Sequence, residues 1–331
     1  MEENAVRSET RWVVVGYGMG WHHARYIERT PGLVLHGICD VSPERLAKAK
    51  AEHPDVKAFN SFDEAIADPD ARGIVVVTPH NTHAPLAIRA MNAGKHVITD
   101  KAMCLTVAEG EAMIGARDAN RVLLSVFHNR RWDGDFLAVR KIVADYELGD
   151  LYHIQSCVTD WGKPGGWRAD RSAMGGWMFD WGAHTLDQIL LLARSRPVSV
   201  YAFSHYRFDE PSSVEDYINC TITFENGLTA TTVVGYVNML SMPRWYVIGR
   251  FGALECAGFD TPVRVSKLWN GARQDREVAL APSDWAAYYS NIADVLAGRS
   301  DLAVTPEQVL PQIAIAEAAY RSIETQQVVR L

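Results

Sequence analysis

The fold is decided by the stretch W-V-V-V-G-Y-G-M-G, residues 12–20. Its first half is an apolar run typical of a buried strand, and its glycines form a turn in which backbone N–H groups can approach a pyrophosphate. The dinucleotide-binding fingerprint is usually G-x-G-x-x-G, whereas here the third glycine comes one residue early and Trp21 takes its usual place. The predicted cofactor-binding turn consists of Gly16, Tyr17, Gly18, Met19 and Gly20.

A carboxylate at the end of the next apolar run supports this interpretation. Asp40 directly follows the run at residues 33–39. A carboxylate at that position accepts hydrogen bonds from the adenosine ribose hydroxyls and repels a 2′-phosphate. We therefore expect NAD as the cofactor, with NADP disfavoured.

Strand and helix patterns alternate through the first part of the chain. Short apolar runs lie at residues 12–15, 33–39, 73–77, 96–99 and 122–126, and helical patterns lie at 43–52, 85–93 and 106–119. Such runs suit strands that are buried on both faces, and their alternation with helices implies a parallel sheet covered on both sides. The sequence predicts an α/β Rossmann domain with a doubly wound parallel sheet over residues 1–126.

The pattern changes after residue 126. Helices are expected at residues 132–146, 177–193, 284–297 and 305–324, and strands at 214–224, 228–237, 246–251, 253–256 and 263–268. The first two of these strands flank Asn226-Gly227, which is a strong hairpin signal. We expect residues 127–331 to form an α+β domain with a mostly antiparallel sheet.

The composition narrows the class of protein. The 331 residues are 48% hydrophobic and 22% charged, with a net charge of −7. These values exclude a disordered or fibrous protein, and they lack the basic excess that nucleic-acid binding requires. No apolar run is long enough to span a membrane, and residues 1–11 are too polar for a signal peptide. The five cysteines form no C-x-x-C pair, so we expect no disulfide framework, no zinc ribbon and a cytoplasmic location.

Two loops at strand ends carry polar side chains toward the expected cofactor. Thr78, Pro79, His80 and His83 follow the run at residues 73–77. Ligands of open α/β sheets lie outside the carboxyl ends of the strands, so this loop is predicted to contact the cofactor. His80 and His83 have no cysteine or carboxylate nearby to complete a ligand set, and no metal is expected.

Lys101 follows the next run, at residues 96–99, within the sequence Asp100-Lys101-Ala102. A lysine at this end of the sheet can bind both cofactor and substrate, and burial lowers the pKa of a lysine toward a useful range. It can hydrogen-bond a substrate hydroxyl or help to move its proton.

The sequence G-G-W-M-F-D-W-G-A-H-T-L-D, residues 175–187, is the strongest feature of the second domain. If it is helical throughout, Asp180 and His184 share one face at a spacing of four residues, with Asp187 on a neighbouring face. A carboxylate beside a histidine raises its pKa and orients the ring. The pair is therefore suited to accept a proton from an alcohol.

Together, these motifs resemble the Gfo/Idh/MocA oxidoreductases, from about Arg11 to the C-terminus. Residues 127–136, which include His128, are most similar to the scyllo-inositol dehydrogenase branch. The resemblance implies that Lys101, Asp180 and His184 form the catalytic set. It also implies that residues 127–331 form a substrate-binding domain with a large, open sheet, through which homodimers or homotetramers assemble. The family usually has Glu-Lys-Pro where this chain has Asp100-Lys101-Ala102.

The leading hypothesis is an NAD-dependent dehydrogenase that oxidises a secondary alcohol of a sugar, cyclitol or glycoside. In this hypothesis His184 takes the hydroxyl proton and Lys101 stabilises the oxygen. Four of the ten tryptophans lie within residues 161–181, and apolar faces of ring-shaped polyols stack on indoles. The predicted substrate contacts are Lys101, His128, Asp160, Trp161, Trp167, Arg168, Asp180 and His184.

Two alternatives use the same residues. In one, NAD stays bound and cycles, so that the net reaction is a redox-neutral glycoside cleavage or an internal oxidoreduction. In the other, the chain is a non-catalytic sensor of NAD or sugar, because a fold does not by itself determine a function.

Overall fold

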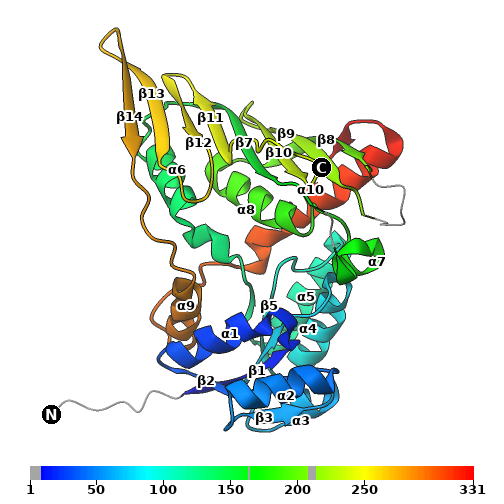
Figure 1. The fold of residues 1–331 in the computed structure, drawn as a ribbon. Helices are drawn as coiled ribbons and strands as arrows, with labels where there is room; N and C mark the ends of the chain where they lie inside the picture. The colour runs from blue at the N-terminus through cyan, green and yellow to red at the C-terminus, as the bar shows by residue number, and fades with distance from the viewer. Residues whose placement is uncertain (1–8, 163–164, 208–213) are drawn as a thin grey trace, which may run out of the picture. The chain divides into compact units, whose positions relative to one another are not determined.

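The computed structural model describes residues 9–162, 165–207 and 214–331 (Figure 1). The chain forms two compact units. The first comprises residues 1–104, 108–127 and 286–309, and the second comprises residues 105–107, 128–285 and 310–331. We expected one boundary, between residues 126 and 127. The chain passes from the first unit to the second after Phe127, and residues 286–309 return to the first unit.

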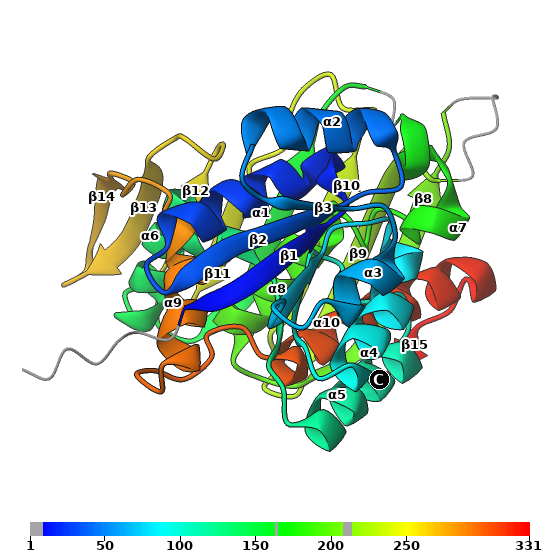
Figure 2. The same ribbon diagram turned by 90° about the horizontal axis from the view of Figure 1, so that it is seen from below.

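The first unit contains a six-stranded parallel sheet in the order β3-β2-β1-β4-β5-β6 (Figure 2). Its strands are β1 (Thr10–Val15), β2 (Leu33–Cys39), β3 (Lys57–Phe59), β4 (Gly73–Val76), β5 (His96–Thr99) and β6 (Leu124–Val126). This order is that of the Rossmann fold and confirms the predicted fold class. The short strand β3 is half exposed and was not predicted.

Helices cover both faces of this sheet, as Figure 2 shows. They are α1 (Tyr17–Arg29), α2 (Pro43–Glu52), α3 (Phe62–Ala67), α4 (His83–Asn92), α5 (Val107–Asn120) and α9 (Ala286–Leu296). Helix α2 has the predicted bounds because the Ser42 side chain accepts a hydrogen bond from the Arg45 N–H and Pro43 occupies the first helical position. Helix α3 was not predicted.

The second unit contains a nine-stranded sheet in the order β14-β13-β12-β11-β7-β10-β9-β8-β15. Its strands are β7 (Leu151–Thr159), β8 (Pro197–His205), β9 (Tyr217–Phe224), β10 (Thr229–Gly235), β11 (Trp245–Gly249), β12 (Gly252–Cys256), β13 (Val263–Trp269), β14 (Ala272–Val278) and β15 (Val329–Arg330). The described strands pair antiparallel except β7 with β10, which confirms a mostly antiparallel sheet. Thr223 pairs with Thr229 across the predicted turn, where Gly227 has a φ of 82°.

Three of the described helices of the second unit begin later than expected, and the short helix at residues 171–174 was not predicted. These helices are α6 (Gly134–Ala144), α7 (Arg171–Met174), α8 (Trp181–Ala193) and most of α10 (Pro306–Thr325). Residue 132 ends a short 3-10 turn instead of starting α6. The helix predicted from residue 177 begins only at Trp181, because residues 177–180 form a separate turn.

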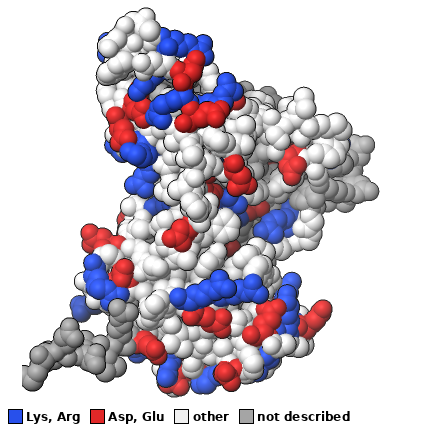
Figure 3. Space-filling model, turned by 60° about the vertical axis from the view of Figure 1, so that its left-hand side comes forward, with Lys and Arg blue, Asp and Glu red and all other residues white. Residues whose placement is uncertain are grey.

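One face of the nine-stranded sheet is packed by helix α8, and no described helix covers the other face (Figure 1). The exposed aromatic side chains Tyr201, Phe203 and Tyr246 lie on its strands. On the face drawn in Figure 3, basic and acidic side chains are interspersed. Within the described residues, no helix combines the length and the apolar composition needed to cross a bilayer.

Helix α9 packs into the first unit through two adjacent tyrosines. The Tyr288 hydroxyl donates a hydrogen bond to Ser125 Oγ at 2.8 Å, and Tyr289 Oη lies 2.6 Å from His23 Nδ1. His23 is completely buried, and burial lowers its pKa from 6.5 to about 4. The folded first unit therefore holds this imidazole neutral at pH values where the unfolded chain protonates it.

This difference predicts a pH-dependent stability of the first unit. As the pH falls from about 6.5 to about 4, the unfolded state binds a proton at His23 that the folded state does not, so stability is lost in that window. The loss of stability amounts to roughly 3 kcal/mol. His23→Gln keeps a hydrogen-bonding group for Tyr289 but does not titrate, so we expect this contribution to the pH dependence to be absent from the variant. Urea unfolding of both proteins across the window measures the effect. Identical pH dependence in the two proteins contradicts it.

Candidate functional site

The glycine turn joins β1 to α1 in the first unit. Gly16 has a φ of 92°, and a Cβ there would lie 2.1 Å from the Val77 backbone oxygen. A Cβ on Gly20 would lie 2.7 Å from Val14 Cγ1. At Gly18, the nearest atom to a Cβ is the Arg45 guanidinium carbon at 3.5 Å. Gly16 and Gly20 are thus required by packing, whereas exposed Gly18 is where a ligand can approach the backbone.

Asp40 bridges this turn to the start of α2. Its side chain is 5% exposed; Oδ2 accepts a hydrogen bond from the Tyr17 N–H at 2.8 Å and Oδ1 accepts one from the Ser42 N–H at 2.9 Å. Arg45 Nη1 lies 3.7 Å from Oδ2. Sequence reasoning missed Arg45, whose only signal is a cation shortly after the carboxylate that ends β2.

The loop after β4 is tied to the loop after β5 by a buried imidazole. His83 Nδ1 lies 2.6 Å from the Ala102 carbonyl oxygen and Nε2 lies 2.8 Å from that of Thr78. Burial lowers the pKa of His83, against the opposing effect of these two carbonyls. His80 is also buried, with its ring centroid 5.6 Å from that of His83. His83 therefore joins the two loops through its contacts with their carbonyl groups, and the buried His80 packs beside it.

Lys101 lies in the second of these loops and is half-buried. Its backbone N–H donates a hydrogen bond to Asp100 Oδ1 at 2.8 Å. The peptide bond to Ala102 is cis, at the position where the resembling family has proline. Ala102 is fully buried and accepts the His83 contact through its carbonyl.

In the second unit, Asp180 precedes helix α8 instead of lying within it. Its backbone has φ −97° and ψ −93°, so the predicted one-face helical pairing with His184 is wrong in its geometry. The buried Asp180 carboxylate accepts a hydrogen bond from Arg168 Nε at 3.0 Å. His184, 6% exposed, lies in the first turn of α8 with its ring centroid 5.8 Å from that of Trp181.

A second histidine connects His184 to a buried ion pair. The ring centroid of His128 lies 5.9 Å from that of His184, and its Nδ1 lies 3.9 Å from Asp187 Oδ2. Arg131 donates two hydrogen bonds to the Asp187 carboxylate, at 2.8 and 2.6 Å. Burial alone raises the pKa of Asp187, but Arg131 and His128 outweigh it and hold the pKa below its usual range. Asp187 is thus a fixed negative charge behind the two imidazoles.

The tryptophan cluster divides into buried and accessible members. Trp177 is buried and stacks on Tyr236, with ring centroids 4.5 Å apart. Trp161 is 48% exposed, and its backbone N–H donates a hydrogen bond to Asp160 Oδ1 at 2.7 Å. Half-buried Trp167 lies under the Arg168 guanidinium at 4.6 Å. Of the four, only Trp177 is buried; Trp161 is exposed, and Trp167 and Trp181 are half-buried.

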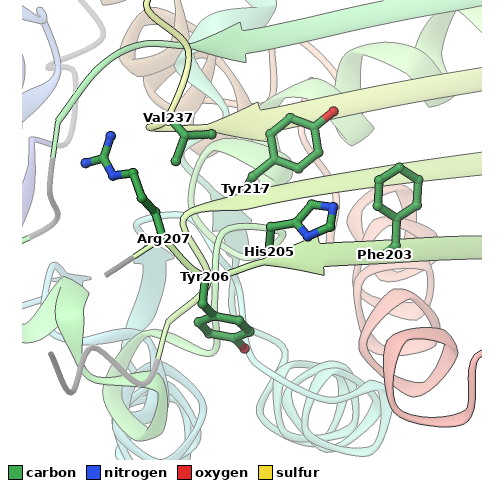
Figure 4. A pocket seen from close by; sticks show the side chains of 6 residues that line it. All are labelled: Phe203, His205, Tyr206, Arg207, Tyr217 and Val237. Atoms are coloured by element: carbon green, nitrogen blue, oxygen red, sulfur yellow. The ribbon is translucent and has the colours of Figure 1, made fainter. Parts of the chain in front are cut away.

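A pocket of about 450 Å³ opens at the end of β8 and the start of β9 (Figure 4). Phe203 and His205 enter it from β8 and Tyr217 enters it from β9. Arg207 connects this pocket to the tryptophan cluster, because its guanidinium lies 3.9 Å from the centroid of the Trp161 ring.

One cluster with metal-ligand chemistry occurs among the described residues, in the first unit. It consists of His36, Asp68 and Asp70, whose ligand atoms lie within 4.8 Å of one another. Lys57 Nζ lies 2.9 Å from Asp68 and 3.6 Å from Asp70, so the protein supplies its own cation to these carboxylates.

Two protein families match the chain, one in each half. Residues 10–128 match the family described as an oxidoreductase family with an NAD-binding Rossmann fold. Residues 136–255 match the GFO/IDH/MocA C-terminal domain.

Individual relatives span nearly the whole chain. The scyllo-inositol 2-dehydrogenase (NADP(+)) of Bacillus subtilis (strain 168) is 27% identical, over 96% of this chain and 95% of the relative. The crystal structure of an NAD-binding protein from Listeria innocua matches with a TM-score of 0.89 and 30% identity, over 98% of this chain and 100% of that one. The aldose-aldose oxidoreductase from Caulobacter crescentus, complexed with glycerol, matches with a TM-score of 0.83 and 27% identity, over 98% and 100%.

The different surroundings of Gly16 and Gly18 predict different effects of alanine. Gly16→Ala places a Cβ against backbone at positive φ, so we expect the unfolding free energy to fall by about 3 kcal/mol or more. Gly18→Ala leaves stability unchanged but raises the dissociation constant for NADH at least tenfold. Thermal melting without cofactor and titration with NADH separate the two effects. Equal losses of stability in both variants contradict the assignment.

Proposed function

Because the chain belongs to the Gfo/Idh/MocA family of oxidoreductases, we propose that it oxidises a secondary alcohol of a sugar, cyclitol or glycoside with a nicotinamide cofactor. The observation that carries this proposal is the segment from Asp180 to Asp187, which follows a dinucleotide-binding unit in the same chain. It combines a buried carboxylate, an imidazole and a second, fixed carboxylate.

In the proposed mechanism, the nicotinamide supplies the hydride acceptor when bound. His184 takes the proton of the substrate hydroxyl. The fixed charge of Asp187, through His128, favours the imidazolium that this transfer creates. Asp180 and Lys101 hydrogen-bond the substrate, and Lys101 stabilises negative charge on the reacting oxygen.

The proposed substrate is a ring-shaped polyol. The names of two relatives, a scyllo-inositol dehydrogenase and an aldose-aldose oxidoreductase, refer to such molecules. The accessible rings of Trp161 and Trp167 suit the apolar face of a pyranose or cyclitol, and Asp160 and Arg168 suit its hydroxyls.

We propose NAD as the preferred cofactor, although the Bacillus subtilis relative is named for NADP(+). The buried Asp40 carboxylate places a negative charge at the end of β2, which disfavours a 2′-phosphate. Arg45 lies close enough to offset part of that charge. The preference for NAD therefore depends on the balance between these two side chains.

A second candidate reaction is redox-neutral, with the nicotinamide retained and reoxidised by a second sugar. The similarity of the chain to an aldose-aldose oxidoreductase supports this redox-neutral reaction as a candidate. Accumulation of free NADH with a single polyol supports the dehydrogenase, whereas product formation without NADH supports cycling.

We also propose that the chain forms a homodimer or homotetramer through the open face of the nine-stranded sheet. The exposed aromatic side chains Tyr201, Phe203 and Tyr246 on its strands support this assembly. Sedimentation equilibrium measures it directly.

Replacing the proposed base tests the reaction. In His184→Ala we expect kcat for NADH formation, screened over inositols, monosaccharides and glycosides, to fall at least a hundredfold, because proton transfer loses its acceptor. The dissociation constant for NAD changes less than twofold. His153→Ala is the matched control, since His153 lies on β7 and its Nδ1 lies 2.9 Å from Thr229 Oγ1. Full activity of His184→Ala rules out the assigned role.

Replacing Asp40 tests the cofactor preference. Asp40→Ser keeps an acceptor for a backbone N–H but removes the charge, so the ratio of kcat/KM with NADP to that with NAD rises at least tenfold. Arg45→Ala in the same background reverses much of this gain, because the 2′-phosphate loses its cation. Exposed Glu44→Ser is the charge control, with less than a twofold change. An unchanged ratio in Asp40→Ser refutes the proposal.

A further inference from the structure

Glu215 is a completely buried carboxylate, two residues before β9, that the mechanism above does not use. Its Oε1 accepts hydrogen bonds from the Tyr320 hydroxyl at 2.6 Å and from the Trp177 N–H at 2.8 Å. Its Oε2 lies 3.2 Å from Arg171 Nη1. Burial raises the pKa of Glu215, and these three partners oppose that effect. The chain thus places a carboxyl group here despite the cost of burying it.

Tyr320, on α10, holds the same turn at its next residue. Its hydroxyl oxygen accepts a hydrogen bond from the Met178 N–H at 3.1 Å. Its ring stacks on that of Phe179, with centroids 5.9 Å apart and planes at 14°. Glu215 and Tyr320 therefore bind two successive N–H groups and one side chain of the turn at residues 177–180.

The conformation of Gly176 reflects this contact. It has a φ of 110°, and a Cβ there would lie 2.0 Å from Tyr320 Oη and 3.0 Å from Glu215 Oε1. Any larger residue would displace the pair. The second glycine of the G-G-W motif thus allows the backbone to approach the carboxylate and the hydroxyl.

The turn leads directly into the proposed catalytic segment. The Trp177 carbonyl oxygen accepts hydrogen bonds from the Asp180 N–H at 3.2 Å and from the Gly182 N–H at 2.8 Å. Residue 177 is consequently bound to Glu215 through its N–H and to the start of α8 through its carbonyl. Asp180 immediately precedes this helix, and His184 lies in its first turn.

We propose that Glu215 and Tyr320 are positioning residues that hold the turn at residues 177–180 and so place Asp180 and His184. The part of this inference that concerns turnover rests on the proposed function. The two side chains are 0% and 7% exposed, so they act through the turn.

The test uses the full chain with Tyr320→Phe and Glu215→Gln. Tyr320→Phe keeps the ring against Phe179 and loses only the hydroxyl, so the core is preserved. We expect both variants to lower kcat at least tenfold while KM for NAD changes less than twofold. Without substrate, amide hydrogen exchange of the segment 176–182, followed by mass spectrometry, is expected to accelerate at least tenfold.

Tyr288→Phe is the matched control. It also removes a buried tyrosine hydroxyl, which donates a hydrogen bond to Ser125, but in the first unit. We expect it to leave kcat and exchange of the segment 176–182 within twofold of the wild type. An equal loss of kcat in this control overturns the inference, as does faster exchange with unchanged kcat.

The exchange measurement separates this inference from the proposed function. If wild-type protein oxidises no ring polyol, the proposed function fails, and exchange alone decides whether the two residues hold the turn. Unchanged exchange in both variants then overturns the inference as well.

Discussion

The second unit depends on one constraint, which is that the polar residues of the buried helix α8 need partners. An unpaired buried donor or acceptor costs stability, and an unpaired buried charge costs more. Asp187 is paired by Arg131, the Thr232 hydroxyl donates to that of Thr185 at 2.6 Å, and the Gln188 amide donates to the Arg130 carbonyl at 2.7 Å. These bonds join α8 both to strand β10 and to the segment that precedes α6.

The same constraint gives the proposed site its electrostatics. Asp180 lies at the N-terminus of α8, where the helix dipole favours a negative charge, and its carboxylate forms an ion pair with Arg168. Asp187 lies within the helix, and its carboxylate forms an ion pair with Arg131. His184 lies between these two carboxylates in the sequence. The cation that pairs with Asp180 is partly exposed, whereas the cation that pairs with Asp187 is buried.

Much of the first unit could be predicted because its determinants are local. Apolar runs such as residues 33–39 are buried strands, and Ser42-Pro43 starts α2 at the predicted residue. Strand β3 and helix α3 were missed because three and six residues are too few to show a period. Strand β14, Ala-Arg-Gln-Asp-Arg-Glu-Val, was missed because its side chains are almost all polar and exposed. The pattern of glycines predicted a ligand turn, but it could not show that packing also requires Gly16 and Gly20.

The geometry of the candidate site could not be predicted, because distant parts of the chain determine it. A spacing of four residues suggested that Asp180 and His184 share a helical face, yet the chain turns at residues 177–180. The first two N–H groups of this turn bond to Glu215 and Tyr320. Tyr320 lies 142 residues from the amide it holds. The only local trace of this contact is Gly176, which in sequence alone indicates flexibility. In the structure the same glycine allows the backbone of the turn to approach Tyr320 and Glu215 closely.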